Sequence, residues 1–212
     1  MKHNILETIY DRLVSTFGPQ HWWPGDTPFE VAVGAILTQN TNWQNVEKAI
    51  NNLKHVRALS AKALHTMPAA ELSGHIRPAG YFNIKAKRLK NFVNFLIKDY
   101  QGSMKKMAKE DLTIIRHKLL SVNGIGPETA DSIILYALEK AVFVIDAYTK
   151  RILSRHTILH HDASYEIYQN LFHEKLRTDA SLFNEYHALM VRLAKDFCRP
   201  DPRCSGCPLE RI

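Results

Sequence analysis

Apolar residues recur at three- and four-residue intervals along most of the chain, the spacing that places side chains on one face of an α-helix. In residues 5–17 this face carries Ile5, Ile9, Leu13 and Phe17, and the following Gly18-Pro19 pair is a helix-stop signal. Comparable patterns predict helices within residues 28–41, 43–56, 60–67, 68–76, 84–100, 109–122, 128–140, 146–156, 164–176 and 182–197.

One short apolar run departs from this pattern. Residues 141–145 read Ala-Val-Phe-Val-Ile, a stretch rich in β-branched residues that could form a strand. No second run of this kind offers it a partner, so the predicted fold class is all-α.

Charge and length narrow the range of functions. The 212 residues include 28 Lys and Arg against 21 Asp and Glu, a formal net charge of +7. This excess fits a polyanionic partner such as DNA, although a basic protein without a nucleic-acid role has the same balance. No apolar stretch approaches the roughly 20 residues that span a bilayer, and the N-terminus lacks the apolar core of a signal peptide. We expect a cytoplasmic monomer that does not bind membranes.

Residues 122–131, Val-Asn-Gly-Ile-Gly-Pro-Glu-Thr-Ala-Asp, join two predicted helices through a turn. Gly124 and Gly126 permit positive φ and a close backbone approach, and Pro127 suits the first position of the second helix. Amides of such a turn can bind a phosphate. Taken alone, the pattern fits a simple tight turn equally well.

Asp146 follows further along the chain, where the apolar run ends and a helix begins. Asp is a favoured N-cap, so this position has a structural explanation of its own. Together with the hairpin, however, it resembles the arrangement in the endonuclease III-like superfamily of helix-hairpin-helix (HhH-GPD) DNA glycosylases. Residues 34–41, 80–89, 124–137 and 144–152 and the cysteine-containing tail follow the family's order nearly end to end.

The resemblance implies two helical lobes. Residues 22–132 would form a central helical domain with the hairpin near its end. Residues 1–21 and 133–212 would form the second lobe, which ends in a cysteine loop at 198–212. The implied partner is double-stranded DNA containing a damaged base, and the implied location is the nucleoid of a prokaryotic cytoplasm.

The family also implies a chemistry. The aspartate that matches Asp146 stabilises positive charge on the sugar or orients the attacking water. Members that also cut the backbone have a lysine where Glu128 stands, and that lysine forms a Schiff base. A carboxylate cannot form this imine, so we expect a monofunctional enzyme with weak or absent AP-lyase activity. Glu128 is also simply favourable as an acid near a helix N-terminus.

The branch of the family specific for 3-methyladenine looks most similar. Its Trp-Trp-Pro element matches Trp22, Trp23 and Pro24, and it has an aromatic residue where Trp43 stands, although it can have Lys in place of Pro127. Indole rings favour cations, as an N-alkylated purine is, and a flipped base is held by stacking. These four residues and Glu128 form the predicted base pocket; for the tryptophans, core packing is the alternative.

Further residues match positions that contact DNA in the family. Gln39 and Tyr81 would fill the space left by the extruded base. The other predicted DNA-binding residues are Asn40, Lys85, Lys87, Gly124, Gly126, Thr129 and Lys150. The alternatives are a hydrogen-bonding residue at a helix end for Gln39, a half-buried loop residue for Tyr81, and a solvated helix face for Lys85 and Lys87.

All three cysteines lie in the pattern Cys198-x5-Cys204-x2-Cys207. It resembles the family's [4Fe–4S] loop, in which four thiolates hold the cluster, but the fourth cysteine would fall just past Ile212. We expect a [4Fe–4S] cluster in the natural protein; a truncated chain, an incomplete cluster or no metal are the alternatives. Zinc completed by a histidine such as His187 is the rival metal.

The leading hypothesis is therefore a DNA N-glycosylase of base excision repair that removes an alkylated purine such as 3-methyladenine. One alternative is an endonuclease III-like glycosylase with lyase activity on oxidised pyrimidines or mismatched bases. The alternative of another class is a DNA-binding protein that keeps the hairpin but has lost the chemistry.

Overall fold

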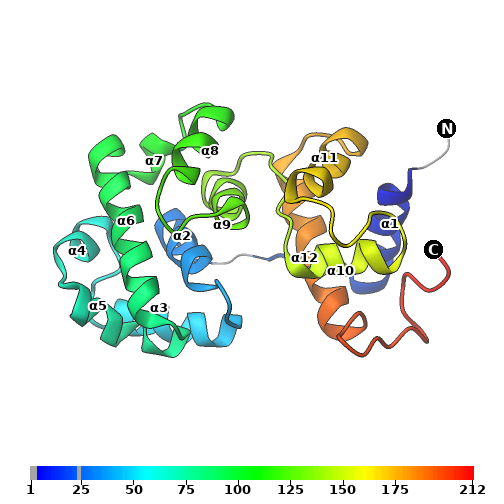
Figure 1. Ribbon diagram of the computed structural model, residues 1–212, viewed down its shortest axis with the longest axis horizontal. Coiled ribbons are helices and arrows are strands. Elements are labelled where there is room, and N and C mark those ends of the chain that lie inside the picture. Colours follow the sequence, from blue (N-terminus) through cyan, green and yellow to red (C-terminus); the bar gives the residue numbers. More distant parts are fainter. Residues whose placement is uncertain (1–3, 23–24) are drawn as a thin grey trace. The chain divides into compact units, whose positions relative to one another are not determined.

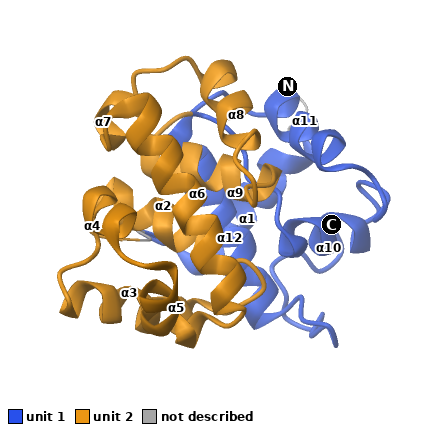
Figure 2. Ribbon diagram, turned by 60° about the vertical axis from the view of Figure 1, so that its left-hand side comes forward, with its two compact units in different colours: residues 1–22, 141–212 blue, residues 23–140 orange. Residues whose placement is uncertain are grey.

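The computed structural model describes residues 4–22 and 25–212. Within these ranges the chain is helical and contains no β-strand (Figure 1), which confirms the all-α class. The chain divides into two compact units, coloured separately in Figure 2: unit 1 is Met1–Trp22 with Ala141–Ile212, and unit 2 is Trp23–Lys140. No helix in the described ranges is long and apolar enough to cross a bilayer.

The second boundary differs from the expected position after residue 132. It falls after Lys140 because α9 (Pro127–Ser132) continues directly into the π-helical turn η2 (Ile133–Ala137), which packs against α2 (Pro28–Leu37). Ile133, Ile134 and Leu135 are buried there, so this apolar surface belongs to the core of unit 2.

Unit 2 is built around α6 (Phe82–Tyr100), against which α2, α4, α5 and α7 pack. The apolar face of α6, with Leu89, Phe92, Val93 and Leu96, is buried. The other elements of unit 2 are α3 (Trp43–His55), α4 (Ala61–Thr66), α5 (Ala69–His75), η1 (Arg77–Ala79), α7 (Met104–Met107) and α8 (Leu112–Leu120).

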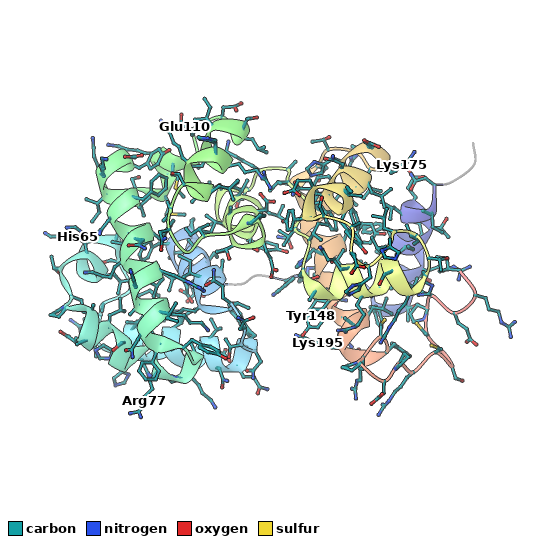
Figure 3. All side chains as sticks on the ribbon, viewed as in Figure 1. His65, Arg77, Glu110, Tyr148, Lys175 and Lys195 are labelled. Atoms are coloured by element: carbon teal, nitrogen blue, oxygen red, sulfur yellow. The ribbon has the colours of Figure 1, made fainter. Side chains whose placement is uncertain are left out.

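One lysine of α6 caps the C-terminal end of the neighbouring helix α4. The Lys90 ammonium donates to the carbonyls of Leu64 at 3.0 Å and Met67 at 2.9 Å, and also to that of His65, which Figure 3 labels. Carbonyls at a helix C-terminus have no partner within the helix, so this contact satisfies three of them with one cation.

Unit 1 consists of α1 (Ile5–Phe17), α10 (Ala147–Arg155), α11 (Tyr165–Lys175) and α12 (Ala180–Asp196), and both α1 and α10 pack on α12. The first helix has the predicted bounds and ends at Gly18. Its buried side chains are Leu6, Ile9 and Leu13, whereas Ile5 is 40% exposed. The buried face of α1 therefore differs from the predicted one at its start, because Leu6 and not Ile5 faces the core.

Helix starts in both units follow a simple chemical rule. Before most helices a short polar side chain accepts a hydrogen bond from a first-turn amide, which would otherwise lack a partner; α5, α6 and α9 begin without one. The residues that do so include Asn4, Thr27, Asn42, Asp111, Asp146, Ser164 and Asp179.

Candidate functional site

Asp146 is the N-cap of α10. One carboxylate oxygen accepts a hydrogen bond from the Thr149 amide at 2.7 Å, and the other lies 3.5 Å from Nε2 of His187 in α12. Burial, with a side chain only 13% exposed, acts to raise the pKa of Asp146, but His187 and the Thr149 amide outweigh it and hold the pKa below its usual value. Unit 1 therefore holds an ionised, nearly buried carboxylate.

The segment that leads to Asp146 is the predicted strand candidate, residues 141–145. It is buried and extended but pairs with no strand in the described part of the chain. Side chains of α11 take the place of a partner strand. His173 Nε2 accepts from the Phe143 amide at 3.0 Å, Gln169 donates to the Phe143 carbonyl at 2.7 Å, and Tyr165 Oη lies 3.3 Å from the Ile145 amide.

These three side chains stand at four-residue intervals on one face of α11, so they meet an extended segment as a row. The aromatic ring of Phe143 also stacks on Phe172 of the same helix, with ring centroids 3.7 Å apart. Together these contacts fix the backbone immediately before Asp146. Sequence reasoning missed this role of α11, because polar residues at helical spacing usually indicate a solvated face.

Trp22, a predicted base-pocket residue, stacks on His187 with ring centroids 5.6 Å apart and planes 9° from parallel. Both rings belong to unit 1, as does Asp146. Trp23 and Pro24, the other two members of the Trp-Trp-Pro element, lie outside the described residues.

The hairpin forms in unit 2 between α8 and α9. Gly124 has φ +97°, and Pro127 occupies the first turn of α9 as predicted. Glu128 is exposed in that same turn. Gly126 has φ −93°, an extended conformation that any residue adopts, so of the two glycines only Gly124 needs its conformational freedom.

Gln39 connects this hairpin to α6. Its Nε2 donates to the Gly124 carbonyl at 3.1 Å and to Thr129 Oγ1 at 2.9 Å, while its Oε1 accepts from the Arg88 guanidinium. Thr129 is buried under this contact. The predicted DNA contact of Thr129 is therefore replaced by a bond inside unit 2, and Gln39 must leave its three partners before it can fill a gap in DNA.

Lys85 corrects another prediction. Its side chain is 1% exposed, and its ammonium donates to the carbonyls of Leu37 at 2.8 Å and Ala79 at 2.7 Å. Burial, with Arg88 nearby, lowers its pKa to about 8. A phosphate contact at Lys85 is therefore wrong for this structure: the helical pattern located the residue but gave no sign that it faces the carbonyl ends of α2 and η1.

Other predicted DNA contacts do lie at the surface. Tyr81 is 69% exposed and has a left-handed backbone just before α6, and Asn40 and Lys87 are also exposed. Lys150 in unit 1 is only half-exposed; it donates to the Ala163 carbonyl at 3.1 Å and lies over the Tyr168 ring.

Trp43 is half-buried at the start of α3 and rests on α2. A Cβ atom added at Gly34 would lie only 3.3 Å from the tip of its indole ring. This side chain therefore has a packing role in unit 2, the alternative that the sequence left open, and its part in a base pocket stays a prediction.

The [4Fe–4S] cluster expected at the cysteine loop stays a prediction. No group of three or more His, Cys, Asp or Glu side chains within the described residues is arranged to hold a metal ion, and the sequence supplies three thiols where the family's cluster uses four. Burial, with the nearby Cys198 and Cys204, raises the pKa of Cys207 and so disfavours the thiolate. His187, the suggested zinc ligand, instead contacts Asp146.

Two arginines of α10 hold this loop. Arg151 donates to the Cys198 carbonyl at 2.7 Å and covers the ring of Tyr148, which Figure 3 labels. Arg155 donates to the Pro200 carbonyl at 2.8 Å. The loop is thus ordered by guanidinium contacts from the same helix that begins at Asp146.

Comparison with known proteins places these features in a family. Residues 33–178 match the family model described as HhH-GPD superfamily base excision DNA repair protein. The chain belongs to the HhH-GPD superfamily. The matched range contains both the hairpin and Asp146, and it confirms the resemblance seen in the sequence.

Relatives within this superfamily extend over nearly the whole chain. It is 47% identical to the Methanocaldococcus jannaschii protein named "Putative DNA repair glycosylase MJ1434", over all of this chain and 96% of that one. It is 30% identical to the H. pylori 3-methyladenine DNA glycosylase MagIII solved with 1,N6-ethenoadenine, with a TM-score of 0.78 over 90% of this chain and 96% of that one.

A third HhH-GPD protein, endonuclease III in a non-covalent DNA complex, superimposes with a TM-score of 0.83. It shares 20% identity and is matched over 99% of this chain and 94% of that one, a likeness of fold alone. The superfamily match and these relatives together show that this protein is a DNA glycosylase of base excision repair.

Proposed function

We propose that this glycosylase is monofunctional and hydrolyses the glycosidic bond of an alkylated purine such as 3-methyladenine in duplex DNA. The observation that carries the proposal is the ionised, nearly buried carboxylate of Asp146 at the start of α10. Breaking the bond builds positive charge on the sugar. A fixed carboxylate stabilises that charge or orients the water that attacks it.

Glu128 supports hydrolysis without strand cleavage. It occupies the position of the Schiff-base lysine in the family's lyases, and its carboxylate cannot form an imine. Lys85 does not replace that lysine, because it is buried and donates to two carbonyls of its own unit.

Trp22 supports an alkylated purine as the substrate. N-alkylation leaves the purine cationic, and an indole face attracts cations. A cationic base is also a good leaving group, so a carboxylate without a partner acid suffices for the reaction. The structural similarity to a 3-methyladenine glycosylase is consistent with this substrate class.

The test separates base release from strand cleavage. Purified protein is incubated with duplexes that carry 3-methyladenine, thymine glycol, a G·T mismatch or a G·U mismatch, and released bases and nicks are measured in separate assays. We expect release of methyladenine, with breaks only after alkali treatment. Release of another base would overturn the substrate class, and spontaneous nicks would overturn the monofunctional assignment.

Asp146→Asn is the matched control. Asn is as good an N-cap as Asp, so the substitution retains the start of α10 and removes only the charge. We expect base release to fall by about 10²-fold or more while the melting temperature stays near that of the wild type. Unchanged release would remove Asp146 from the mechanism, and a protein that binds DNA but releases no base would be a binding protein.

A further inference from the structure

His187 occupies a buried position between Asp146 and Trp22 in unit 1. Its side chain is 6% exposed, and its Nε2 lies 3.5 Å from the second carboxylate oxygen of Asp146. This distance is at the outer limit of a hydrogen bond, so the contact is chiefly electrostatic. The first oxygen is already held by the Thr149 amide. The carboxylate is therefore held from two helices, α10 and α12.

Two aromatic rings fix the plane of the imidazole. Trp22 stacks on it within 9° of parallel, and Phe143 meets it edge-on at 80°, with ring centroids 6.3 Å apart. Phe143 is itself anchored by α11 through its amide and carbonyl. The ring that faces Asp146 is thus oriented by the segment that leads to Asp146.

The position of His187 matters because the reaction uses the carboxylate of Asp146. An imidazole fixed 3.5 Å from the second carboxylate oxygen limits the movement of that oxygen while positive charge builds on the sugar. A catalytic group that is held in the right geometry contributes more to the rate than one that moves freely.

We propose that His187 is a positioning residue for Asp146: stacked on Trp22, it holds the carboxylate in place for glycosidic bond hydrolysis. This inference rests on the proposed role of Asp146. It gives Trp22 a second role besides base stacking, because without the indole the imidazole ring of His187 would lose a contact that fixes its orientation.

Asp146 is the carboxylate that contacts His187. Trp22 and Phe143 contribute uncharged rings to its surroundings. Tyr186, its neighbour in α12, donates its hydroxyl to the Leu6 carbonyl of α1 at 2.8 Å. His173 of α11 stacks on Phe183 and accepts from the Phe143 amide.

Two substitutions separate positioning from packing. His187→Gln retains an N–H donor at a similar reach but loses the ring that stacks on Trp22. His187→Phe retains the stack on Trp22 but has no donor. Single-turnover base release and DNA affinity are measured between pH 5 and 9, on whichever duplex the wild type cleaves. Circular dichroism and the melting temperature show that each variant is folded.

We expect His187→Phe to lower the single-turnover rate about tenfold or more at every pH, with DNA affinity unchanged. His187→Gln should retain most of the rate, because it keeps a donor near the carboxylate. Full activity of His187→Phe, or a His187→Gln variant as slow as His187→Phe, would overturn the positioning role and leave the role of Asp146 intact.

The role of His187 can also be tested without a DNA substrate, by measuring the pKa of Asp146. The carboxyl group of Asp146 is titrated by NMR in the wild type and in His187→Phe. Loss of the imidazole should raise the pKa of Asp146. An unchanged titration would show that His187 does not act on the carboxylate, whereas a protein that releases no base but shows the shift would refute only the proposed function.

Discussion

Gly124 is the hairpin residue at which a single methyl group should have the largest effect. Its φ of +97° is rarely adopted by other residues, and an added Cβ would lie 2.3 Å from Cγ and 3.0 Å from Cδ of Arg88. Cγ is close to the α6 backbone, so relief requires a new Arg88 rotamer. That movement breaks the bond from the guanidinium to Gln39.

The magnitude follows from these two effects. A non-glycine residue in this backbone region costs about 1–3 kcal/mol, and loss of a hydrogen bond from a charged donor costs about 1.5–3 kcal/mol. Restriction of the unfolded chain by alanine offsets about 0.4–1 kcal/mol. Gly124→Ala should therefore reduce the free energy of unfolding by about 2–5 kcal/mol.

Gly126→Ala is the control within the same turn. Its φ of −93° is ordinary and an added Cβ meets nothing within 4 Å, so we expect a change of at most about 1 kcal/mol. Urea denaturation is followed by tryptophan fluorescence and by circular dichroism. Equal effects of the two substitutions, or a Gly124→Ala variant as stable as the wild type, would refute the steric argument.

Three further predictions test other parts of the molecule. The pKa of Lys85 falls from 10.5 to about 8 on folding, so between these pH values the unfolded chain binds more protons and the free energy of unfolding rises with pH. Urea denaturation should show the free energy of unfolding of the wild type rising relative to that of Lys85→Met over this range. A difference that does not depend on pH would contradict the burial of Lys85. Glu128→Lys should yield a covalent complex with DNA that borohydride traps, since it restores the family's Schiff-base residue; release of the base without trapping would show that the residue match is wrong. Gln169→Leu leaves the buried Phe143 carbonyl without its 2.7 Å donor and should cost about 1–3 kcal/mol in urea denaturation, whereas an unaltered midpoint would mean that the carbonyl finds another partner.

The sequence predicted those features that depend on local chemistry. Helical spacing located α1 and α6, and the favoured N-cap residue Asp146 predicted the start of α10. The hairpin follows from Gly124 and Pro127 in the same way. Asp146 could be found because a favoured N-cap coincided with a family motif, two signals that adjacent residues carry by themselves.

What the sequence could not determine depends on contacts between distant segments. Lys85 looked like part of a basic helix start, yet it is buried because the carbonyls of Leu37 and Ala79 converge on it. Thr129 looked available to DNA, yet Gln39 occupies it. In each case the partner comes from another element, and no spacing within one helix shows which element will pack there.

The surroundings of Asp146 show the same division. The chain itself determined that a carboxylate caps α10. Tertiary packing decided that α11 supports the extended segment before it and that His187, from α12, faces its second oxygen. Side-chain direction along one helix is set by local geometry, but the charge a carboxylate carries depends on what is buried beside it, and only the folded chain brings those groups together.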